Sequence, residues 1–155
     1  MTKALYPGSF DPFTVAHEEI VRKALTIFDK VVVGIGYNIS KSGFLPIEER
    51  EAIINEVFKD DDRVEVVHYN TLTIDLCHKM DIKHIVRGVR SYTDFESENN
   101  LADINSILAP EIITIYLTTS PKYSAVSSTA VREIIKFGSD PSFFLSKGIT
   151  IKIPR

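Results

Sequence analysis

Five short apolar runs alternate with longer amphipathic stretches along the chain, and this alternation restricts the fold more than any other feature. The runs predict strands at residues 3–6, 30–36, 63–69, 83–86 and 112–117. The second run is continuously apolar, as is typical of a parallel strand covered on both faces, and the fifth run is nearly continuous. Strands that alternate with helices form parallel sheets. We therefore expect an α/β fold: a Rossmann-like, doubly wound sheet of five parallel strands with helices on both faces.

The first three helices are expected from their start signals and apolar spacing. Thr14 is a suitable N-cap, and apolar residues recur on one helical face from Ile20 onward. Pro46 opens the second helix, with acidic residues in its first turn. Thr71 is the expected cap of the third helix, whose inner face is predicted to contain Leu72, Leu76, Cys77 and Met80.

Two longer helices are expected in the second half of the sequence. One begins at Ser91 or Thr93 and reaches about Leu108, and the other is capped by Ser127 or Ser128. Tyr92 and Phe95, near the start of the first of these helices, could flank a substrate or fill the core, and we expect the core.

The secondary-structure signals are weaker in the C-terminal region than in the rest of the sequence. Gly138 is expected to end the preceding helix. Asp140 and Pro141 then predict one more short helix, which closes near Gly148. Residues 149–153 alternate in polarity and predict an extended tail.

Length and composition favour one domain over residues 1–155. The chain has 155 residues, and it shows no repeat, linker or low-complexity segment. No apolar run approaches the roughly 20 residues that a membrane helix needs, and no signal peptide is expected, because the N-terminus leads directly into a strand. Cys77 is the only cysteine, which excludes an internal disulfide and favours a cytoplasmic location. We expect Cys77 to be a buried structural thiol.

Polar side chains gather after four of the five strands. In doubly wound sheets, ligands bind beyond the carboxyl ends of the strands, at the switch point in strand order. The residues that follow those strands are Ser9, His17, Lys41, Arg87, Arg90, Tyr123, Ser124, Ser127, Ser128, Thr129 and Arg132. The net charge of −3 argues against a general nucleic-acid binder, so these cations are concentrated locally. A basic, hydroxyl-rich pocket in an acidic protein suits a phosphate-bearing substrate.

Each of these signals also has a purely structural interpretation. Lys41 is in a polar loop and could be a solvated lysine, and the serines after the fifth strand could be no more than a helix cap. Arg132 could point back toward that cap or pair with Glu133. The other three histidines lack metal-ligand spacing and are expected to be structural or surface residues. The absence of a GxGxxG motif and of a P-loop argues against a dinucleotide oxidoreductase and a P-loop kinase.

Two motifs resemble the signatures of a known enzyme superfamily. Thr14-Val15-Ala16-His17 is similar to the (H/T)xGH motif of the nucleotidylyltransferases, and residues 126–132 are similar to their ISSTxxR motif. The YPGSFDP, RGVR and DFESE segments, at residues 6–12, 87–90 and 94–98, resemble the bacterial phosphopantetheine adenylyltransferases in particular. The resemblance runs from about Leu5 to Phe144. It departs from the family at Ala16, where the motif has glycine.

The resemblance implies an activity and its requirements. The family transfers the adenylyl group of ATP to 4′-phosphopantetheine, which gives dephospho-coenzyme A and pyrophosphate in the penultimate step of coenzyme A synthesis. It uses Mg²⁺, which we expect to be bound mainly through the ATP phosphates with no metal site of the protein's own. It is commonly a homohexamer. Neither a nucleic-acid partner nor a membrane is implied.

The resemblance also implies roles for individual residues. The expected catalytic residues are His17, Lys41 and Arg90. The expected phosphopantetheine contacts are Ser9, Lys41, Thr73 and Arg87. The expected ATP contacts are Ser9, Phe10, His17, Gly88, Val89, Arg90, Glu98, Tyr123, Ser124, Ala125, Val126, Ser127, Ser128 and Thr129.

The residues themselves are compatible with direct transfer of the adenylyl group to the acceptor phosphate, without a covalent enzyme intermediate. No serine or cysteine has an adjacent base that would indicate a covalent intermediate. An acceptor phosphate monoester is largely ionised near neutral pH, because its second pKa is about 6, so no general base is required. Two alternatives remain open: a nucleotidylyltransferase that uses another phosphate acceptor, and a non-catalytic nucleotide-binding protein, which only Ala16 favours.

Overall fold

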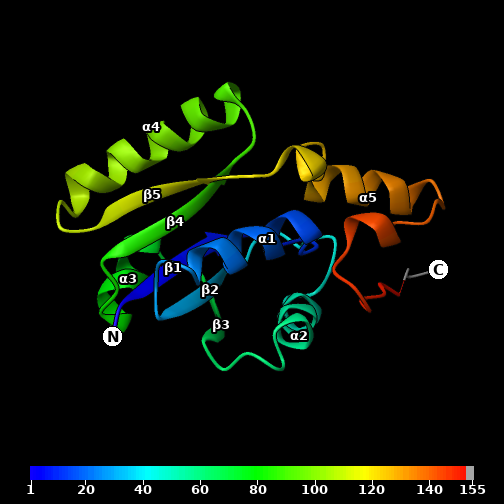
Figure 1. Cartoon of the computed structure of the whole chain (residues 1–155), viewed down its shortest axis with the longest axis horizontal. Coiled ribbons are helices and arrows are strands. Elements are labelled where there is room, and N and C mark those ends of the chain that lie inside the picture. The colour runs from blue at the N-terminus through cyan, green and yellow to red at the C-terminus, as the bar shows by residue number, and fades with distance from the viewer. Residues whose placement is uncertain (153–155) are drawn as a thin grey trace.

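A parallel five-stranded sheet organises the chain (Figure 1). The computed structural model describes residues 1–152. The strands are β1 (Lys3–Gly8), β2 (Lys30–Gly36), β3 (Val64–Tyr69), β4 (His84–Val89) and β5 (Ile113–Thr118). They lie in the order β3-β2-β1-β4-β5, and every pairing is parallel. The predicted α/β sheet of five parallel strands is confirmed.

Helices cover both faces of this sheet. The helices are α1 (Val15–Ala24), α2 (Ile47–Val57), α3 (Thr73–Met80), α4 (Tyr92–Leu108) and α5 (Ser128–Lys136). Ile20 of α1 and Ile54 of α2 pack with Val31 and Val33 on one face. Leu76 of α3 packs with neighbouring strand residues on the other face. Residues 31 to 35 of β2 are all buried, which explains why this run is continuously apolar.

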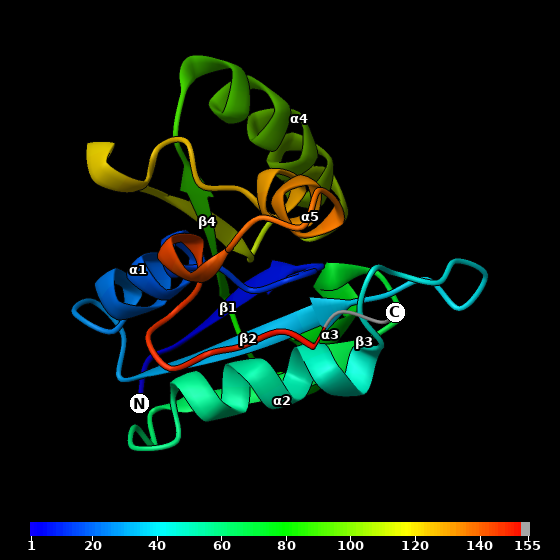
Figure 2. The same cartoon turned by 90° about the vertical axis from the view of Figure 1, so that its right-hand side faces the viewer.

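The last segment of the described chain packs beside α2 (Figure 2). Leu145 and Ile149 join Val131 and Ile135 of α5 in a small separate cluster. The predicted short helix from Asp140 to about Gly148 is wrong, because only one 3₁₀ turn forms, at Ser142–Phe144. Leu145 is extended and buried instead, so its packing overrides the local helix signal. Residues 149–152 form no strand, and the rest of the predicted tail, residues 153–155, lies outside the described residues.

Most expected helix starts are confirmed. Thr14, Pro46, Ser91 and Ser127 are N-caps. Gly138 follows the C-terminus of α5 with a φ of +76°, a left-handed conformation that glycine adopts without strain.

The expected start of α3 is wrong by one residue. Leu72, not Thr71, is the N-cap, and the Thr71 hydroxyl donates to the Leu72 carbonyl instead of capping the helix. The side chain of Leu72 is 60% exposed, so it does not belong to the predicted inner face. Cys77 is buried as expected, and burial raises the pKa of its thiol to about 11.

The prediction that Tyr92 and Phe95 fill the core is also wrong. Tyr92 is 79% and Phe95 is 39% exposed, and no residue of α4 is buried. Among residues 1–152, no helix is both long and apolar enough to cross a bilayer.

The sheet opens between the central strand β1 and its neighbour β4. β1 pairs with β2 over six residues, but with β4 only at Leu5 and Ile85. The order of the strands reverses between β1 and β4, so this is the switch point at which ligands bind in such sheets. β4 is longer than predicted, because residues 87–89 continue the pairing with β5. Arg87 is therefore part of the strand and does not follow it.

Candidate active site

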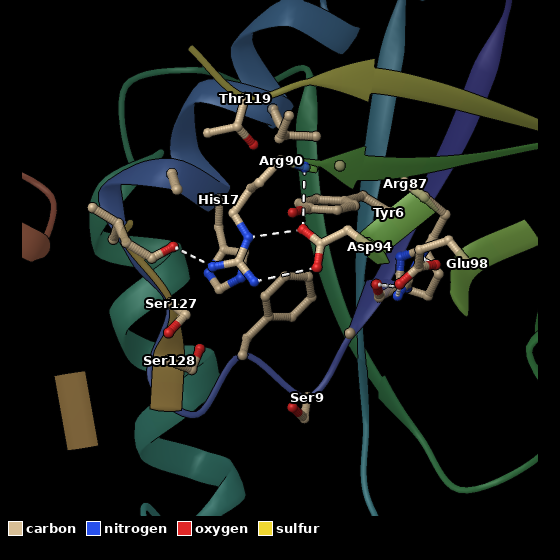
Figure 3. A pocket seen from close by; sticks show the side chains of 17 residues that line it. Tyr6, Ser9, His17, Arg87, Arg90, Asp94, Glu98, Thr119, Ser127 and Ser128 are labelled. Atoms are coloured by element: carbon tan, nitrogen blue, oxygen red, sulfur yellow. Dashed lines mark hydrogen bonds and ion pairs between the residues drawn. The ribbon is translucent and has the colours of Figure 1, made fainter. Parts of the chain in front are cut away.

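A cavity of about 250 Å³ lies where the carboxyl ends of β1 and β4 separate (Figure 3). Its walls come from the loop between β1 and α1, the end of β4, the first half of α4 and the start of α5. The lining residues are Tyr6, Pro7, Gly8, Ser9, Phe10, Ala16, His17, Ile20, Arg87, Gly88, Arg90, Asp94, Glu98, Thr119, Val126, Ser127 and Ser128. Segments far apart in the sequence thus meet at one edge of the sheet.

His17 is held in the first turn of α1 by a reciprocal cap. Its backbone N–H donates to the Thr14 hydroxyl, and the Thr14 N–H donates to its ring Nδ1 at 3.0 Å. Because a backbone N–H can only donate, Nδ1 carries no proton, and the neutral ring has its proton on Nε2. The ring packs against Phe10 and Phe13. Burial, and then the charges of Arg87 and Arg90, lower the pKa of His17 to about 3.

Two helix N-termini also face this cavity. Ala16 of α1 and Ser128 of α5 both line it. The first-turn amides of a helix have no partners within the helix, and the helix dipole adds to their attraction for anions. Ser127 caps α5 by accepting from the Ala130 N–H at 3.0 Å. This edge of the site is therefore built to hold negative charge.

Arg90 bridges three segments over His17 (Figure 3). Its Nε donates to the Asp94 carboxylate at 2.9 Å, and its Nη1 donates to the Val126 carbonyl at 3.3 Å. Asp94 also accepts from the Arg90 N–H at 3.1 Å. These bonds, first of all those from the guanidinium, lower the pKa of Asp94. Arg90 thus ties the end of β4 to α4 and to the segment before α5.

Arg87 is oriented by a second ion pair. Its Nε and Nη2 both donate to the Glu98 carboxylate, and its Nη1 donates to the Pro7 carbonyl. Behind this pair lies a narrower cavity of about 100 Å³, which Arg87 and Glu98 share with Tyr69, Thr73 and Leu101. The structure places Glu98 against Arg87.

Lys41 and Thr73 lie in a wider cavity beside the first. This second cavity has a volume of about 730 Å³, and Tyr37, Asn38 and Tyr69 also line it. Ser9 lines both the first and the second cavity. Lys41 does not line the first cavity, so the predicted site residues are divided between two adjoining spaces.

Some predicted residues lie away from the first cavity. Tyr123 lines a groove along α1. Ser124 and Ala125 are exposed, and Val89 is buried, but none of the three lines the cavity. Thr129 accepts from Arg132 Nη2 at 3.1 Å.

Arg132 points back toward the N-terminal cap of α5, which was one of its two expected orientations. Its Nη1 donates to the Asp11 carbonyl at 2.7 Å, so it connects α5 to the loop that precedes α1.

Among the polar side chains that line the cavity, sequence reasoning missed those of Tyr6, Asp94 and Thr119. Asp94 follows Arg90 by four residues, which is the spacing of ion pairs on a helix, and this signal was available. Thr119 directly follows β5, so its place at the edge of the sheet was also predictable. Tyr6 lies inside a strand and gives no such signal.

In the part of the chain that the structure describes, no three histidine, cysteine or carboxylate side chains are grouped so as to hold a metal ion. His68 pairs with Glu51, and His78 pairs with Glu111. The carboxylates nearest to the first cavity, Asp94 and Glu98, pair with arginines.

The sequence is similar to a family model and to several curated enzymes. The cytidylyltransferase-like family matches residues 5–134. A phosphopantetheine adenylyltransferase of Bacteroides thetaiotaomicron is 46% identical over 97% of this chain and 99% of its own. The enzyme of the same name from Phocaeicola vulgatus is 47% identical, with the same coverage.

A solved structure shares the fold. It is a bifunctional NMN adenylyltransferase/ADP ribose pyrophosphatase from Francisella tularensis, complexed with AMP and a manganese ion. The match has a TM-score of 0.68 at 16% identity, and it covers 96% of this chain but 45% of that longer one.

We predict that His17 stays neutral in the folded protein at pH 5, with its proton on Nε2. Its pKa is about 3 when folded and about 6.5 as a free side chain, so between these values the unfolded chain binds more protons. The free energy of unfolding therefore decreases as the pH falls from about 6.5 toward 3. A pH titration of the imidazole by NMR checks this prediction. A ring that titrates near 6.5, or that carries its proton on Nδ1, contradicts it.

Proposed function

The chain belongs to the cytidylyltransferase-like family and, within it, to the phosphopantetheine adenylyltransferases, and from this premise we propose how its site works. The enzyme transfers the adenylyl group of ATP to 4′-phosphopantetheine, which yields dephospho-coenzyme A and pyrophosphate. The observation that carries the proposal is the convergence of His17, Arg87, Arg90 and two helix N-termini on one cavity at the switch point of the sheet.

In this proposal, ATP lies in the first cavity. Its phosphates lie against the N-termini of α1 and α5, where Ser9, Phe10, Ser127 and Ser128 line the wall. Arg90 binds the phosphates that become pyrophosphate. Gly88 and Val126 line the adenosine end, close to Asp94.

4′-Phosphopantetheine enters from the second cavity. Its phosphate is held by Lys41 and Ser9, and Ser9 forms part of both cavity walls. Thr73 lines the second cavity and the narrow one behind Arg87, so it marks a continuous path for the flexible arm of the acceptor. This arrangement brings the two phosphates together at Ser9.

The reaction is a single in-line displacement. An oxygen of the acceptor phosphate attacks the α-phosphorus of ATP, a new P–O bond forms, and the bond from the α-phosphorus to the leaving pyrophosphate breaks. His17 donates its Nε2–H to an oxygen of the α-phosphoryl group as charge develops there. Because the ring is neutral, it supplies a directed hydrogen bond without giving up its proton. Arg87, Arg90 and Lys41 hold the two anions together.

Magnesium belongs to the substrate in this proposal. The structural neighbour carries AMP with a manganese ion, which supports the use of a divalent metal by this fold. Asp94 and Glu98 are the carboxylates at the cavity, and both pair with arginines, so the protein offers no ready set of ligands there. Mg²⁺ would be held mainly through the ATP phosphates, and it would help to neutralise their charge.

Residues 1–155 form one nucleotidylyltransferase domain of a cytoplasmic homohexamer in this proposal. The solitary cysteine suits a reducing compartment. The exposed side of α4 supports association between copies, because it carries Leu101, Ile104, Ile107 and Leu108 at helical spacing, each at least half exposed. Ile113 of the edge strand β5 is also exposed.

We predict that pyrophosphate is released from MgATP only when 4′-phosphopantetheine is present. Nicotinamide mononucleotide serves as the control acceptor, because the structural neighbour is an NMN adenylyltransferase. Mass spectrometry should find dephospho-coenzyme A. Equal turnover of both acceptors would favour a different nucleotidylyltransferase, and ATP binding without turnover would favour a non-catalytic protein.

We predict that His17→Ala lowers kcat on the order of 10²-fold or more, because it removes one directed hydrogen-bond donor from the transition state. The KM values should change much less. His78→Ala is the matched control, since His78 is exposed on α3 and, among residues 1–152, pairs only with Glu111. Near-normal turnover by His17→Ala would refute the assigned role.

We predict that light scattering finds a hexamer, and that Ile107→Glu reduces it to smaller species. The change places a charge on a side chain that is 79% exposed in the single chain and would be covered in the assembly. Phe137→Glu, at an equally exposed position after α5, is the control and should leave the hexamer intact. A monomeric native protein would contradict the proposal.

A further inference from the structure

Asp11 and Arg50 form a buried pair of charges that the mechanism above does not use. Asp11 is 7% and Arg50 is 6% exposed, and Arg50 Nε lies 3.7 Å from Asp11 Oδ1. The Asp11 carboxylate accepts from the N–H groups of Phe44 and Leu45 at 2.7 and 2.8 Å. Removing two charges from water is costly, so a buried pair of this kind calls for a specific purpose.

The pair connects two loops, and Arg50 reaches both of them from α2. Arg50 Nε donates to the Leu45 carbonyl at 2.9 Å, and Arg50 Nη1 donates to the Ser9 carbonyl at 3.1 Å. With the two bonds to Asp11, all four backbone atoms that the pair contacts lie in loops. One loop follows β1 and carries Ser9. The other, residues 37–45, follows β2 and carries Lys41.

Gly43 leaves no gap between the second loop and the pair. A Cβ atom at this position would lie 2.2 Å from Arg50 Nη2 and 2.7 Å from Asp11 Oδ2. Any side chain there would push the loop off the pair. The close approach fixes the chain two residues after Lys41.

We propose that Asp11 and Arg50 are positioning residues for the acceptor phosphate. Their hydrogen bonds hold the end of the loop that carries Lys41 against the loop that carries Ser9. Lys41 and Ser9, which line the second cavity from these two loops, therefore keep a constant separation. The proposal rests on the roles of Lys41 and Ser9 stated above. Asp11, Arg50 and Gly43 also form part of the wall of the second cavity. The proposal adds that the acceptor side of the site depends on this ion pair, which does not touch the transferred adenylyl group.

A double-mutant cycle between Arg50 and Lys41 tests this. Arg50→Lys keeps the charge but loses the planar fork that reaches both carbonyls. Alone, it should raise the KM for 4′-phosphopantetheine on the order of 10-fold, the usual scale for weakening a hydrogen bond to a charged group. The Kd for an unreactive ATP analogue should change much less. In the Lys41→Ala background, Arg50→Lys should add little, because it acts through Lys41.

The outcomes separate the two claims. If Lys41→Ala leaves the acceptor KM unchanged, the proposed role of Lys41 fails, and the positioning role fails with it. If Lys41→Ala raises the KM but Arg50→Lys adds its full effect in the double variant, the role of Lys41 stands and the positioning role is refuted. Arg63→Lys is the matched control, since Arg63 makes a surface pair with Asp61.

Gly43→Ala is a second route that leaves both charges in place. It should raise the acceptor KM and speed hydrogen exchange at the Phe44 and Leu45 amides, while exchange in β2 stays slow. Ser40→Ala, in the same loop but off the cavity wall, should change neither quantity. Unchanged exchange and unchanged KM in Gly43→Ala would overturn the proposal, whatever Arg50→Lys does to folding.

Discussion

The whole site depends on how the loop between β1 and α1 is held. Its carbonyl groups cannot pair within a sheet or a helix, and partially buried carbonyls need donors. Three side chains from two distant helices supply them: Arg50 of α2 donates to Ser9, and Arg132 and Ser128 of α5 donate to Asp11 and Pro12. Arg87 of β4 donates to the carbonyl of Pro7, near the end of β1 and just before the loop. Phe10, in the middle of this loop, is buried with a φ of +46°, a strained conformation that persists only where the surroundings fix it.

This loop determines the chemistry, because it delivers His17. The reciprocal cap with Thr14 leaves the Nε2–H of a neutral ring available to a ligand. Arg87 lies in β4, the neighbouring strand, and Arg90 directly follows it; each has a carboxylate partner. The site is thus prepared for anions while its arginines stay paired in the free protein. In the proposed mechanism, binding, alignment and charge stabilisation do the catalytic work.

The strands were predictable from their apolar runs, of which the run in β2 is buried on both faces. The caps at Thr14, Ser91 and Ser127 were predictable because local hydrogen bonds decide them. The length of β4 was underestimated, because Arg87 and Gly88 look like loop residues in the sequence. Only their pairing with β5 shows that they belong to the strand. The helix expected near Asp140 does not form, because burial of Leu145 outweighs the local helix signal.

The division of Lys41 and Arg90 between two cavities could not be predicted, because it depends on how the loops pack. The buried contacts of Asp11 and Arg50 could not be predicted for the same reason.

The central claim is that the acceptor phosphate attacks the α-phosphorus of ATP directly, with no covalent enzyme intermediate. The stereochemical course at this phosphorus is its most direct test. ATP made chiral at the α-phosphorus would be converted to dephospho-coenzyme A, and the configuration of the product would be determined. A single in-line displacement predicts inversion. Retention would require two successive displacements and a nucleophile in the protein, and it would contradict the account.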